Sequence, residues 1–273
     1  MRPRENTRPF SPSLTPKKQL GQNFLIDRNI LSKITEACAL TPTETILEIG
    51  PGLGHLTAHL AEKVSRVIAI ETDRRFCKEL TERFKGSNVE IIQADFLKYD
   101  LTNLPLKLKV IGNLPYYISS AIIAKILQER ERFSSLFTTV QLEFGRRLVA
   151  RPDTKDYSAF SCFVQYYAEP KLLFKIKNTS FKPAPKVDSC FMRLHLREKP
   201  LYENVDEPLL FHIIHHAFQK RRKTLPNALD GIIKKGQSSA ILNSLGISLN
   251  ARPENLTIKN FVDIAGALKT FPK

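Results

Sequence analysis

TILEIGPGLGHL, residues 45–56, is the stretch of the chain that decides the fold. It opens with a short apolar run rich in β-forming residues and then breaks at Gly50, Gly52 and Gly54. Glycines permit a tight turn and let a ligand approach the backbone closely. From Leu56 to Val64 the apolar residues recur at helical spacing. The stretch therefore predicts a strand, a glycine loop and a helix in succession.

The same alternation continues downstream. β-rich runs predict strands at 66–71, 89–93, 109–111 and 138–142, and helical spacing predicts helices at 30–39, 73–84 and 119–129. Strands that alternate with helices of this length favour an α/β fold with a doubly wound, mostly parallel sheet. Ligands bind at the C-terminal edge of the strands in such a sheet.

The pattern changes after about residue 155. We expect a helix at 157–167 and strands at 171–176 and 189–196, the last paired antiparallel. Beyond a break at 197–208, spacing is helical over 209–218, 225–233, 240–245 and 258–268. These runs predict a large domain over 19–199 and a small all-helical C-terminal domain over 200–273. Residues 1–18 carry five basic side chains and four prolines and predict a mobile basic arm.

The composition limits the class of protein. A net charge of +15 on 273 residues favours a polyanionic partner, most often a nucleic acid, although a solvated basic surface is the simpler alternative. The four cysteines are widely spaced without a C-x-x-C pair, which is typical of reduced thiols and not of a zinc site. We find no signal-peptide core and no apolar run of about 18 residues, so we expect a cytoplasmic protein.

Two carboxylates follow the next predicted strands. Glu71 ends the second strand, where a carboxylate accepts hydrogen bonds from ribose hydroxyls, and Asp95 follows the third, placed to read an adenine amine. The loop departs from the G-x-G-x-x-G pattern of pyrophosphate sites, because His55 stands where the last glycine would be. This combination predicts S-adenosyl-L-methionine, a nucleoside cofactor without phosphates. For each acid, an exposed strand end without a ligand is the structural alternative.

The fourth strand leads into Asn113-Leu114-Pro115-Tyr116 at the same edge. An adenine amine is a poor nucleophile, because its lone pair is delocalised into the ring. We expect the Asn113 side-chain oxygen and the Leu114 carbonyl to accept hydrogen bonds from its two N–H groups and to favour a pyramidal, reactive nitrogen. Pro115 stiffens the turn, and Tyr116 stacks on the base. An ordinary Asn-x-Pro turn with packed tyrosines is the alternative.

Seven sequence blocks in order resemble the family of ribosomal small-subunit RNA adenine dimethyltransferases. The blocks are LGQNFLID (20–27), LEIGPGLGHLT (47–57), IAIETD (68–73), QADFL (93–97), GNLPYYISS (112–120), SFKPAPKVDS (180–189) and AFQKRRKTLPNAL (217–229). The resemblance implies a Rossmann-like class I methyltransferase domain and a small helical domain. It implies that four methyl groups pass from S-adenosylmethionine to two adjacent adenosines in the 3′-terminal hairpin loop of 16S rRNA, in the immature 30S subunit during late assembly.

Carried over residue by residue, the resemblance also implies the site. It implies that Phe181 is the second aromatic wall against a flipped base, with core packing as the alternative, and that Asn113 touches both cofactor and target. Gly50 and Gly52 face the methionine part of the cofactor. The residues implied to contact the cofactor are Asn23, Leu25, Gly50, Gly52, Glu71, Asp95 and Asn113.

A basic run near a predicted helix end suggests how RNA is held. With two arginines upstream, we expect it to line a cleft beside the active site and to contact phosphates; a solvated helix face is the alternative. The residues are Arg146, Arg147, Lys220, Arg221, Arg222 and Lys223. His212, His215 and His216 share a helix face, but no H-E-x-x-H pattern surrounds them, so we expect no metal site. Nothing in the sequence demands more than a monomer.

Other functions stay open on the sequence alone. An enzyme of the same chemistry acting on large-subunit RNA is the nearest rival, and the basic helical C-terminal block favours the small subunit. A DNA adenine methyltransferase is less consistent, because no separate target-recognition domain is evident. A non-catalytic protein built on this fold, such as an assembly or transcription factor, is the rival from another class.

Overall fold

The computed structural model describes residues 22–233 and 236–270, and the basic arm predicted over 1–18 lies outside this part. Contacts divide the described chain into two compact units. The first holds the residues up to Gly145 together with Glu169–Leu196, and the second holds Arg146–Ala168 and the residues from Arg197 onward. The second unit therefore includes a segment that precedes the boundary expected near residue 200, and the domain limits given above stay predictions.

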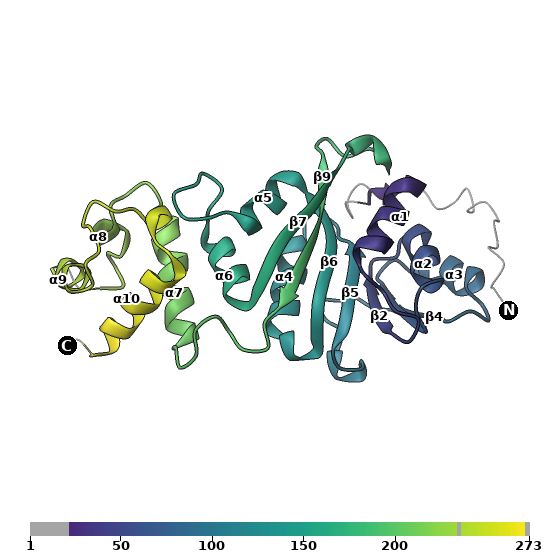
Figure 1. The fold of residues 1–273 in the computed structure, drawn as a ribbon, viewed down its shortest axis with the longest axis horizontal. Coiled ribbons are helices and arrows are strands. Elements are labelled where there is room, and N and C mark those ends of the chain that lie inside the picture. Colours follow the sequence, from purple (N-terminus) through teal and green to yellow (C-terminus); the bar gives the residue numbers. More distant parts are fainter. Residues whose placement is uncertain (1–21, 234–235, 271–273) are drawn as a thin grey trace. The chain divides into compact units, whose positions relative to one another are not determined.

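A seven-stranded sheet in the order β4-β3-β2-β5-β6-β9-β7 forms the first unit's centre (Figure 1). Its first five strands are parallel: β4 (Val89–Gln93), β3 (Arg66–Glu71), β2 (Thr45–Ile49), β5 (Leu108–Asn113) and β6 (Phe133–Gln141). β9 (Ser189–Leu196) pairs antiparallel with β6, and β7 (Ala168–Ile176) is the edge strand. The prediction of a mostly parallel sheet is confirmed, and β3, β4 and β9 have the predicted bounds.

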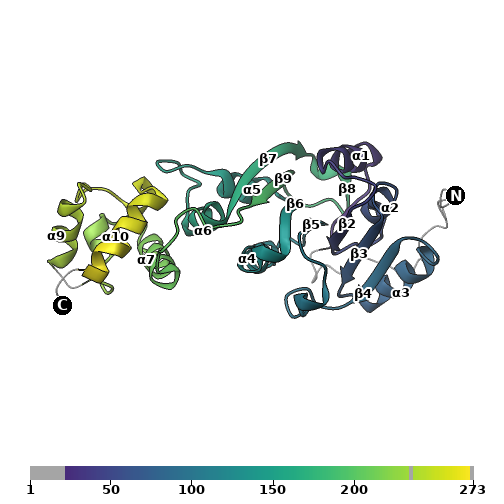
Figure 2. The same ribbon diagram turned by 60° about the horizontal axis from the view of Figure 1, so that its bottom comes forward.

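Helices join the parallel strands and cover both faces of the sheet. α2 (His55–Ala61) connects β2 to β3, α3 (Arg74–Arg83) connects β3 to β4, and α4 (Ser119–Gln128) connects β5 to β6. The sheet order reverses after β4, and right-handed crossovers then put α4 on the face opposite α2 and α3. Figure 2 shows α4 on one side of the strands and α1 (Arg28–Ala37) with α2 on the other. On that second side Ile34, Leu60 and Val67 belong to one buried cluster.

β5 and β6 are longer than expected, and a helix that was not predicted, α5 (Leu142–Val149), follows β6 directly. β5 continues through Gly112 to Asn113, which pairs with Thr139 of β6. Gly112 is required there, because an added Cβ would lie 2.6 Å from the carbonyl oxygen of Ile49. Asn113 is thus the last residue of a buried parallel strand, and the pairing of the sheet sets the direction of its side chain.

A short pair of strands was not predicted either. β1 (Phe24–Leu25) runs antiparallel to β8 (Phe181–Lys182), with Leu25 opposite Phe181. The pairing continues in a backbone bond of 3.0 Å from the Ile26 N–H to the Ser180 carbonyl. Two-residue strands are too short to show an alternating pattern, so only tertiary structure reveals them. The pair anchors the N-terminal segment beside the glycine loop.

Helices dominate the described part of the second unit: α6 (Ala159–Tyr167), α7 (Glu207–Gln219), α8 (Leu225–Ala228), α9 (Gln237–Ser244) and α10 (Ile258–Thr270). α6 packs on α7 through aromatic rings, with Phe163 5.2 Å and Tyr167 5.7 Å from Phe211 between ring centroids. The helix expected over 225–233 is wrong in length. α8 ends at Ala228, and Gly231 then adopts a φ of 98° that turns the chain.

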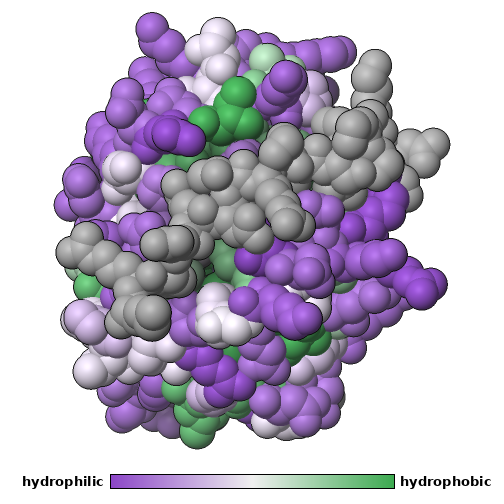
Figure 3. All heavy atoms as spheres, turned by 90° about the vertical axis from the view of Figure 1, so that its right-hand side faces the viewer, coloured by the Kyte–Doolittle hydropathy of each residue, from purple (hydrophilic) through white to green (hydrophobic). Residues whose placement is uncertain are grey.

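The surface of the described residues is mainly polar where Figure 3 shows it. Hydrophilic side chains, drawn in purple, surround small and separate green areas on that face. Within residues 22–233 and 236–270, every helix is too short or too polar to cross a lipid bilayer.

Candidate active site

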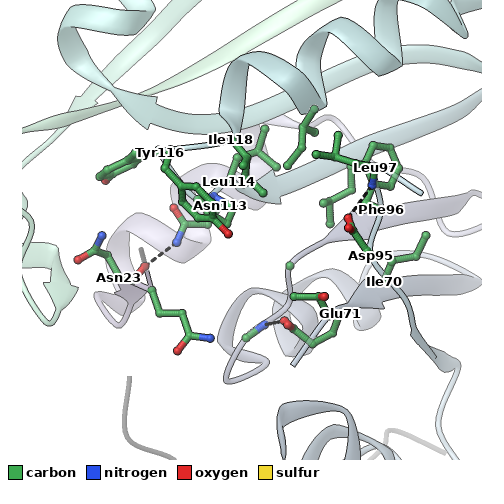
Figure 4. Close-up of a pocket in the computed structure, with 18 of the residues that line it drawn as sticks. Asn23, Ile70, Glu71, Asp95, Phe96, Leu97, Asn113, Leu114, Tyr116 and Ile118 are labelled. Carbon is green, nitrogen blue, oxygen red and sulfur yellow. Dashed lines mark hydrogen bonds between the residues drawn. The ribbon is translucent and has the colours of Figure 1, made fainter. Parts of the chain in front are cut away.

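An open cavity lies where β2, β3, β4 and β5 end. Its walls come from the glycine loop, the turn at Asp95, the turn at Asn113–Tyr116 and the N-terminal residues Gln22–Phe24 (Figure 4). All of these belong to the first unit. The cavity is at the C-terminal edge of the parallel strands, where the sequence predicted it, as is usual for ligand sites in such sheets.

Gly50 and Gly52 bring bare backbone to this cavity. Their φ angles are 70° and 55°, in the left-handed region that strains other residues. A Cβ on Gly50 would meet nothing within 4 Å, whereas one on Gly52 would lie 2.8 Å from the Phe24 ring. Gly50 therefore leaves open space for a ligand, and Gly52 makes room for the packing of the N-terminal segment.

Glu71 ends β3 with its carboxylate held against the glycine loop. Oε2 accepts a hydrogen bond from the Gly52 N–H at 3.1 Å, and Oε1 accepts one from the Asp73 N–H at 2.8 Å. Burial raises the pKa of Glu71, and the backbone donors act in the opposite direction. Each oxygen of a carboxylate has a second acceptor position. Glu71 lines the cavity and is fixed in a geometry in which a ligand's hydroxyl groups can still donate to it.

Asp95 follows β4, the strand next to β3 in the sheet, and lines the same cavity. Its Oδ1 accepts a hydrogen bond from the Leu97 N–H at 2.9 Å, which Figure 4 shows as a dashed line. That bond orients the carboxylate, and Oδ2 is the oxygen left to accept from a ligand. Phe96 and Leu97 line the cavity beside it, and the Phe96 side chain is buried. The wall thus pairs an acceptor with apolar surface, as an adenine ring requires.

Asn113 lines the cavity, and its side-chain amide has a defined orientation. Nδ2 donates to the backbone carbonyl oxygen of Asn23 at 2.8 Å (Figure 4). A carbonyl oxygen only accepts, so this contact requires the amide nitrogen on the Asn23 side. The Asn113 Oδ1 atom is therefore on the other side of the amide, available as an acceptor. Asn23 acts here through its backbone, which explains why its residue type alone did not reveal it.

Tyr116 forms another part of the wall, and its ring is tethered at the hydroxyl end. The hydroxyl lies 2.6 Å from Oγ of Ser189, a fully buried residue at the start of β9. Burial raises the pKa of Tyr116, so the phenol stays neutral at physiological pH. Leu114 also lines the cavity, with its side chain 1% exposed. Ser189 was not predicted from the sequence, since serine carries no periodic signal.

Glu48 is a buried acid beside the cavity that was not among the residues predicted for the site. It is 1% exposed, and its Oε2 has no hydrogen-bond partner among the described residues. Burial raises the pKa of Glu48 to about 8, so the carboxyl is largely protonated at neutral pH. Glu48, Gly50 and Asn113 line a smaller cavity behind the glycine loop. An acid within the apolar run of β2 was the signal that could have identified it.

The structure does not bring Phe181 to the main cavity. Its ring is 3% exposed and packs in the buried cluster that also holds Leu25, its partner across the β1–β8 pair. Leu25 is likewise buried and lines only the smaller cavity behind the glycine loop. This is the core packing weighed above as the alternative for Phe181. A contact of either side chain with a ligand stays a prediction, and for Phe181 it requires the ring to move.

Some of the basic residues predicted to bind RNA form hydrogen bonds within the protein, and others are exposed. Arg221 donates to Glu254 Oε2 at 2.6 Å and to the carbonyl oxygens of Thr154 and Lys155 at 3.3 and 2.7 Å. Lys220 donates to the Asp230 carbonyl oxygen at 2.7 Å. Arg222 and Lys223 are exposed and, with these two, line a groove of the second unit. Of the upstream pair, Arg146 is exposed and Arg147 is half-buried. Their RNA contacts stay predictions, and Arg221 has a structural role that was not foreseen.

The histidines of α7 do not gather other metal ligands. His216 Nε2 lies 2.8 Å from the carbonyl oxygen of Asp230. Within the described part of the chain, no group of three or more histidine, cysteine or acidic side chains has an arrangement that could hold a metal ion.

A family model and the relatives described here point to the same protein family. A family model described as "Ribosomal RNA adenine dimethylase" matches residues 14–270. A protein of Moorella thermoacetica named "Ribosomal RNA small subunit methyltransferase A" is 40% identical over 269 residues, which cover 94% of this chain and 93% of the relative. A protein of the same name from Pelotomaculum thermopropionicum is 41% identical, over 92% and 91% of the two chains.

Two solved structures extend this comparison to the fold. The 23S rRNA methyltransferase ErmE is 30% identical with a TM-score of 0.70, and the match covers 91% of this chain and 100% of that one. A dimethyladenosine transferase from Plasmodium falciparum has a TM-score of 0.79 at 24% identity, over 90% and 97% of the two chains, which shows likeness of fold alone. The prediction of a Rossmann-like class I methyltransferase fold is confirmed.

Proposed function

The chain belongs to the ribosomal RNA adenine dimethylase family, and we propose that it methylates N6 of two adjacent adenosines in the 3′-terminal hairpin loop of small-subunit ribosomal RNA. Each adenosine receives two methyl groups from S-adenosyl-L-methionine, four in all. The observation that carries this proposal is the fixed amide of Asn113 at the cavity wall, with Oδ1 opposite its bond to Asn23.

The residues of the cavity fit the proposed cofactor. S-adenosyl-L-methionine, when bound, supplies a methyl group activated on a positively charged sulfur. Glu71 accepts from the ribose hydroxyls, and Asp95 Oδ2 accepts from the adenine amine beside the apolar surface of Phe96. The open space at Gly50 receives the amino-acid part. Further contacts are proposed for Gly52, Asn23 and Leu25.

The chemistry asked of this chain is mainly positioning. Asn113 Oδ1 and the Leu114 carbonyl accept hydrogen bonds from the two N–H groups of the target amine and keep its lone pair out of ring conjugation. Tyr116 stacks on the base, a contact worth about 1–3 kcal/mol. The methylated amine is acidic and loses its proton to solvent, so no strong general base is needed. The target adenine is unpaired in its loop or leaves its stack before it enters the site.

The choice of small-subunit RNA rests on the relatives. Proteins named for the small subunit match at about 40% identity over nearly the whole chain, whereas the methyltransferase named for 23S RNA is 30% identical. The proposed partner is 16S rRNA in the immature 30S subunit, held partly by phosphate contacts from Arg146, Arg147, Arg222 and Lys223. We further propose a cytoplasmic monomer that works without a metal ion.

One experiment separates this function from its rivals. Immature 30S particles and 50S particles lacking the modification are incubated with the protein and a cofactor labelled in the methyl group, and the nucleosides of each RNA are analysed. The proposal expects N6,N6-dimethyladenosine in 16S rRNA only. The modified nucleoside in 23S rRNA alone would support the large-subunit enzyme. Particle binding without any methylation would support the non-catalytic reading.

A further inference from the structure

Lys125 is a half-buried lysine on α4 whose ammonium group contacts the wall of the main cavity from behind. Nζ donates to the carbonyl oxygens of Phe96 at 2.8 Å, Leu97 at 3.1 Å and Tyr99 at 2.8 Å. An ammonium group has three N–H donors, so these three bonds use all of them. Nζ also lies 5.3 Å from the centroid of the Phe96 ring.

The three carbonyls belong to the turn that carries the proposed adenine contact. Inside this turn the Leu97 N–H binds Asp95 Oδ1, and the N–H groups of Lys98 and Tyr99 both bind the Asp95 carbonyl at 2.9 Å. These local bonds give the turn its shape but do not attach it to the rest of the unit. Asp95, Phe96 and Leu97 face the cavity, and the carbonyls on the other side of the turn point to Lys125.

α4 also carries the opposite wall of the cavity. The helix begins directly after the Asn113–Tyr116 turn, with Ile118 at its N-cap and a Ser119 hydroxyl that donates to the Pro115 carbonyl at 2.9 Å. Ile118 and Ile122 line the cavity one turn apart. Lys125 lies one turn further along, so a single rigid helix connects the proposed catalytic turn to the adenine-side turn.

The positive charge of Lys125 is consistent with its three hydrogen bonds to the carbonyls of this turn. Burial lowers its pKa, and the nearby carboxylates Glu129, Asp95 and Asp100 act in the opposite direction. A charged donor binds a carbonyl more strongly than a neutral one. A partly buried ammonium satisfied by three backbone oxygens therefore restrains them in direction as well as in position.

We propose that Lys125 is a positioning residue that holds the Asp95–Leu97 wall in register with the Asn113–Tyr116 turn and thereby gives the cavity its preference for adenine. This inference rests on the proposed function, because it takes the adenine of S-adenosylmethionine as the group that Asp95 reads. Lys125 itself does not line the cavity, so its effect is transmitted through the turn.

The test is a calorimetric titration of the full chain with two product analogues. S-adenosylhomocysteine carries the adenine amine, and S-inosylhomocysteine has an oxygen in its place. Lys125→Met keeps the length and the apolar stem but removes the three donors. Lys78→Met, at an exposed lysine of α3, is the matched control. We expect Lys125→Met to weaken S-adenosylhomocysteine binding about tenfold, to change S-inosylhomocysteine binding less than about twofold, and to keep one site per chain.

The ratio of the two affinities decides the outcome, because a general loss of folded protein lowers the number of sites and leaves that ratio unchanged. An equal fall for both analogues, or no fall for either, would overturn the inference. If Lys125→Met does not fold, Lys125→Gln keeps two amide donors and is expected to shift the same ratio by a smaller factor. A wild-type chain that binds neither analogue would refute the proposed cofactor, a result distinct from an unchanged ratio.

Discussion

The amide nitrogen of Asn113, at the end of β5, donates to the backbone carbonyl oxygen of Asn23 across 2.8 Å, although 90 residues separate them in sequence. The bond ties the N-terminal segment to the turn proposed to hold the target base. It also decides which end of the amide is left as an acceptor. A side chain without this tether would present either end to the cavity, and only the oxygen can accept from an amine.

Asn113→Ala removes both the acceptor and the tether. We expect kcat for methylation of immature 30S particles to fall at least about 100-fold, as when one preorganised polar contact to a reacting group is lost. Particle binding should change little, because the phosphate contacts are elsewhere. Asn113→Asp is the matched variant: it keeps two oxygens but has no N–H for Asn23, and a large loss is expected there too. Normal dimethylation by Asn113→Ala would disprove the catalytic assignment.

The bond between Tyr116 and Ser189 is expected to restrain the stacking ring. Tyr116→Ala should lower kcat/KM roughly 5- to 150-fold, since about 1–3 kcal/mol of stacking is lost, whereas Tyr116→Phe keeps the ring and should cost less. Ser189→Ala and Tyr116→Phe remove the same bond, so their effects in the double variant should not add. Additive effects in steady-state kinetics would show that this hydroxyl pair does not hold the ring.

The raised pKa of Glu48 leads to a prediction of how the stability of the folded chain depends on pH. Its pKa is about 8 in the folded chain and near 4.5 when unfolded, so between these values the folded state binds more protons. The stability that the Glu48 carboxyl contributes is fully present below about pH 4.5 and is lost as pH rises through about 8, by on the order of 5 kcal/mol. The raised pKa of Glu71 acts with the same sign.

Glu48→Gln removes this titration while keeping the volume of the side chain. Urea unfolding of the cofactor-free protein at pH 5 and pH 9 should therefore show a smaller loss of unfolding free energy in the variant than in the wild type. Glu90→Gln, at a β4 residue that forms an exposed ion pair with Arg66, is the control and should follow the wild type. A pH dependence that is equal in Glu48→Gln and wild type would contradict the assigned pKa.

Arg221 and its neighbour Arg222 are expected to have different roles, the first in stability and the second in RNA binding. Arg221→Met loses the half-buried ion pair with Glu254 and two bonds to carbonyls, and should lower the unfolding free energy by roughly 1–2 kcal/mol. Arg222→Met should leave stability unchanged, weaken RNA binding and reduce the salt dependence of binding by about one unit of slope. Thermal unfolding and salt titrations of RNA binding test both. If Arg221→Met keeps its stability but lowers the salt dependence of RNA binding, Arg221 contacts RNA and the structural role is contradicted.

The local sequence pattern was sufficient to predict those elements whose apolar or glycine pattern repeats within a few residues. β3, β4 and β9 follow from β-rich or alternating runs, and the glycine loop follows from its breaks, because a strand's side chains alternate whatever it pairs with. The same logic placed Glu71, Asp95 and Asn113 at one sheet edge, since parallel strands end together. The domain limits could not be predicted from local pattern, because the segment 146–168 joins the second unit through contacts with residues distant in sequence.

Tertiary structure alone decided the features that depend on which residues meet. The β1–β8 pair joins segments from the two ends of the first unit, and its closure buries Leu25 and Phe181 in the core. Burial makes Glu48 a neutral acid, and the Asn23 carbonyl orients Asn113. The sequence determines the order of strands, helices and turns, because those depend on neighbouring residues. Burial, pKa and side-chain direction depend on atoms brought together by folding, and only the folded chain supplies those atoms.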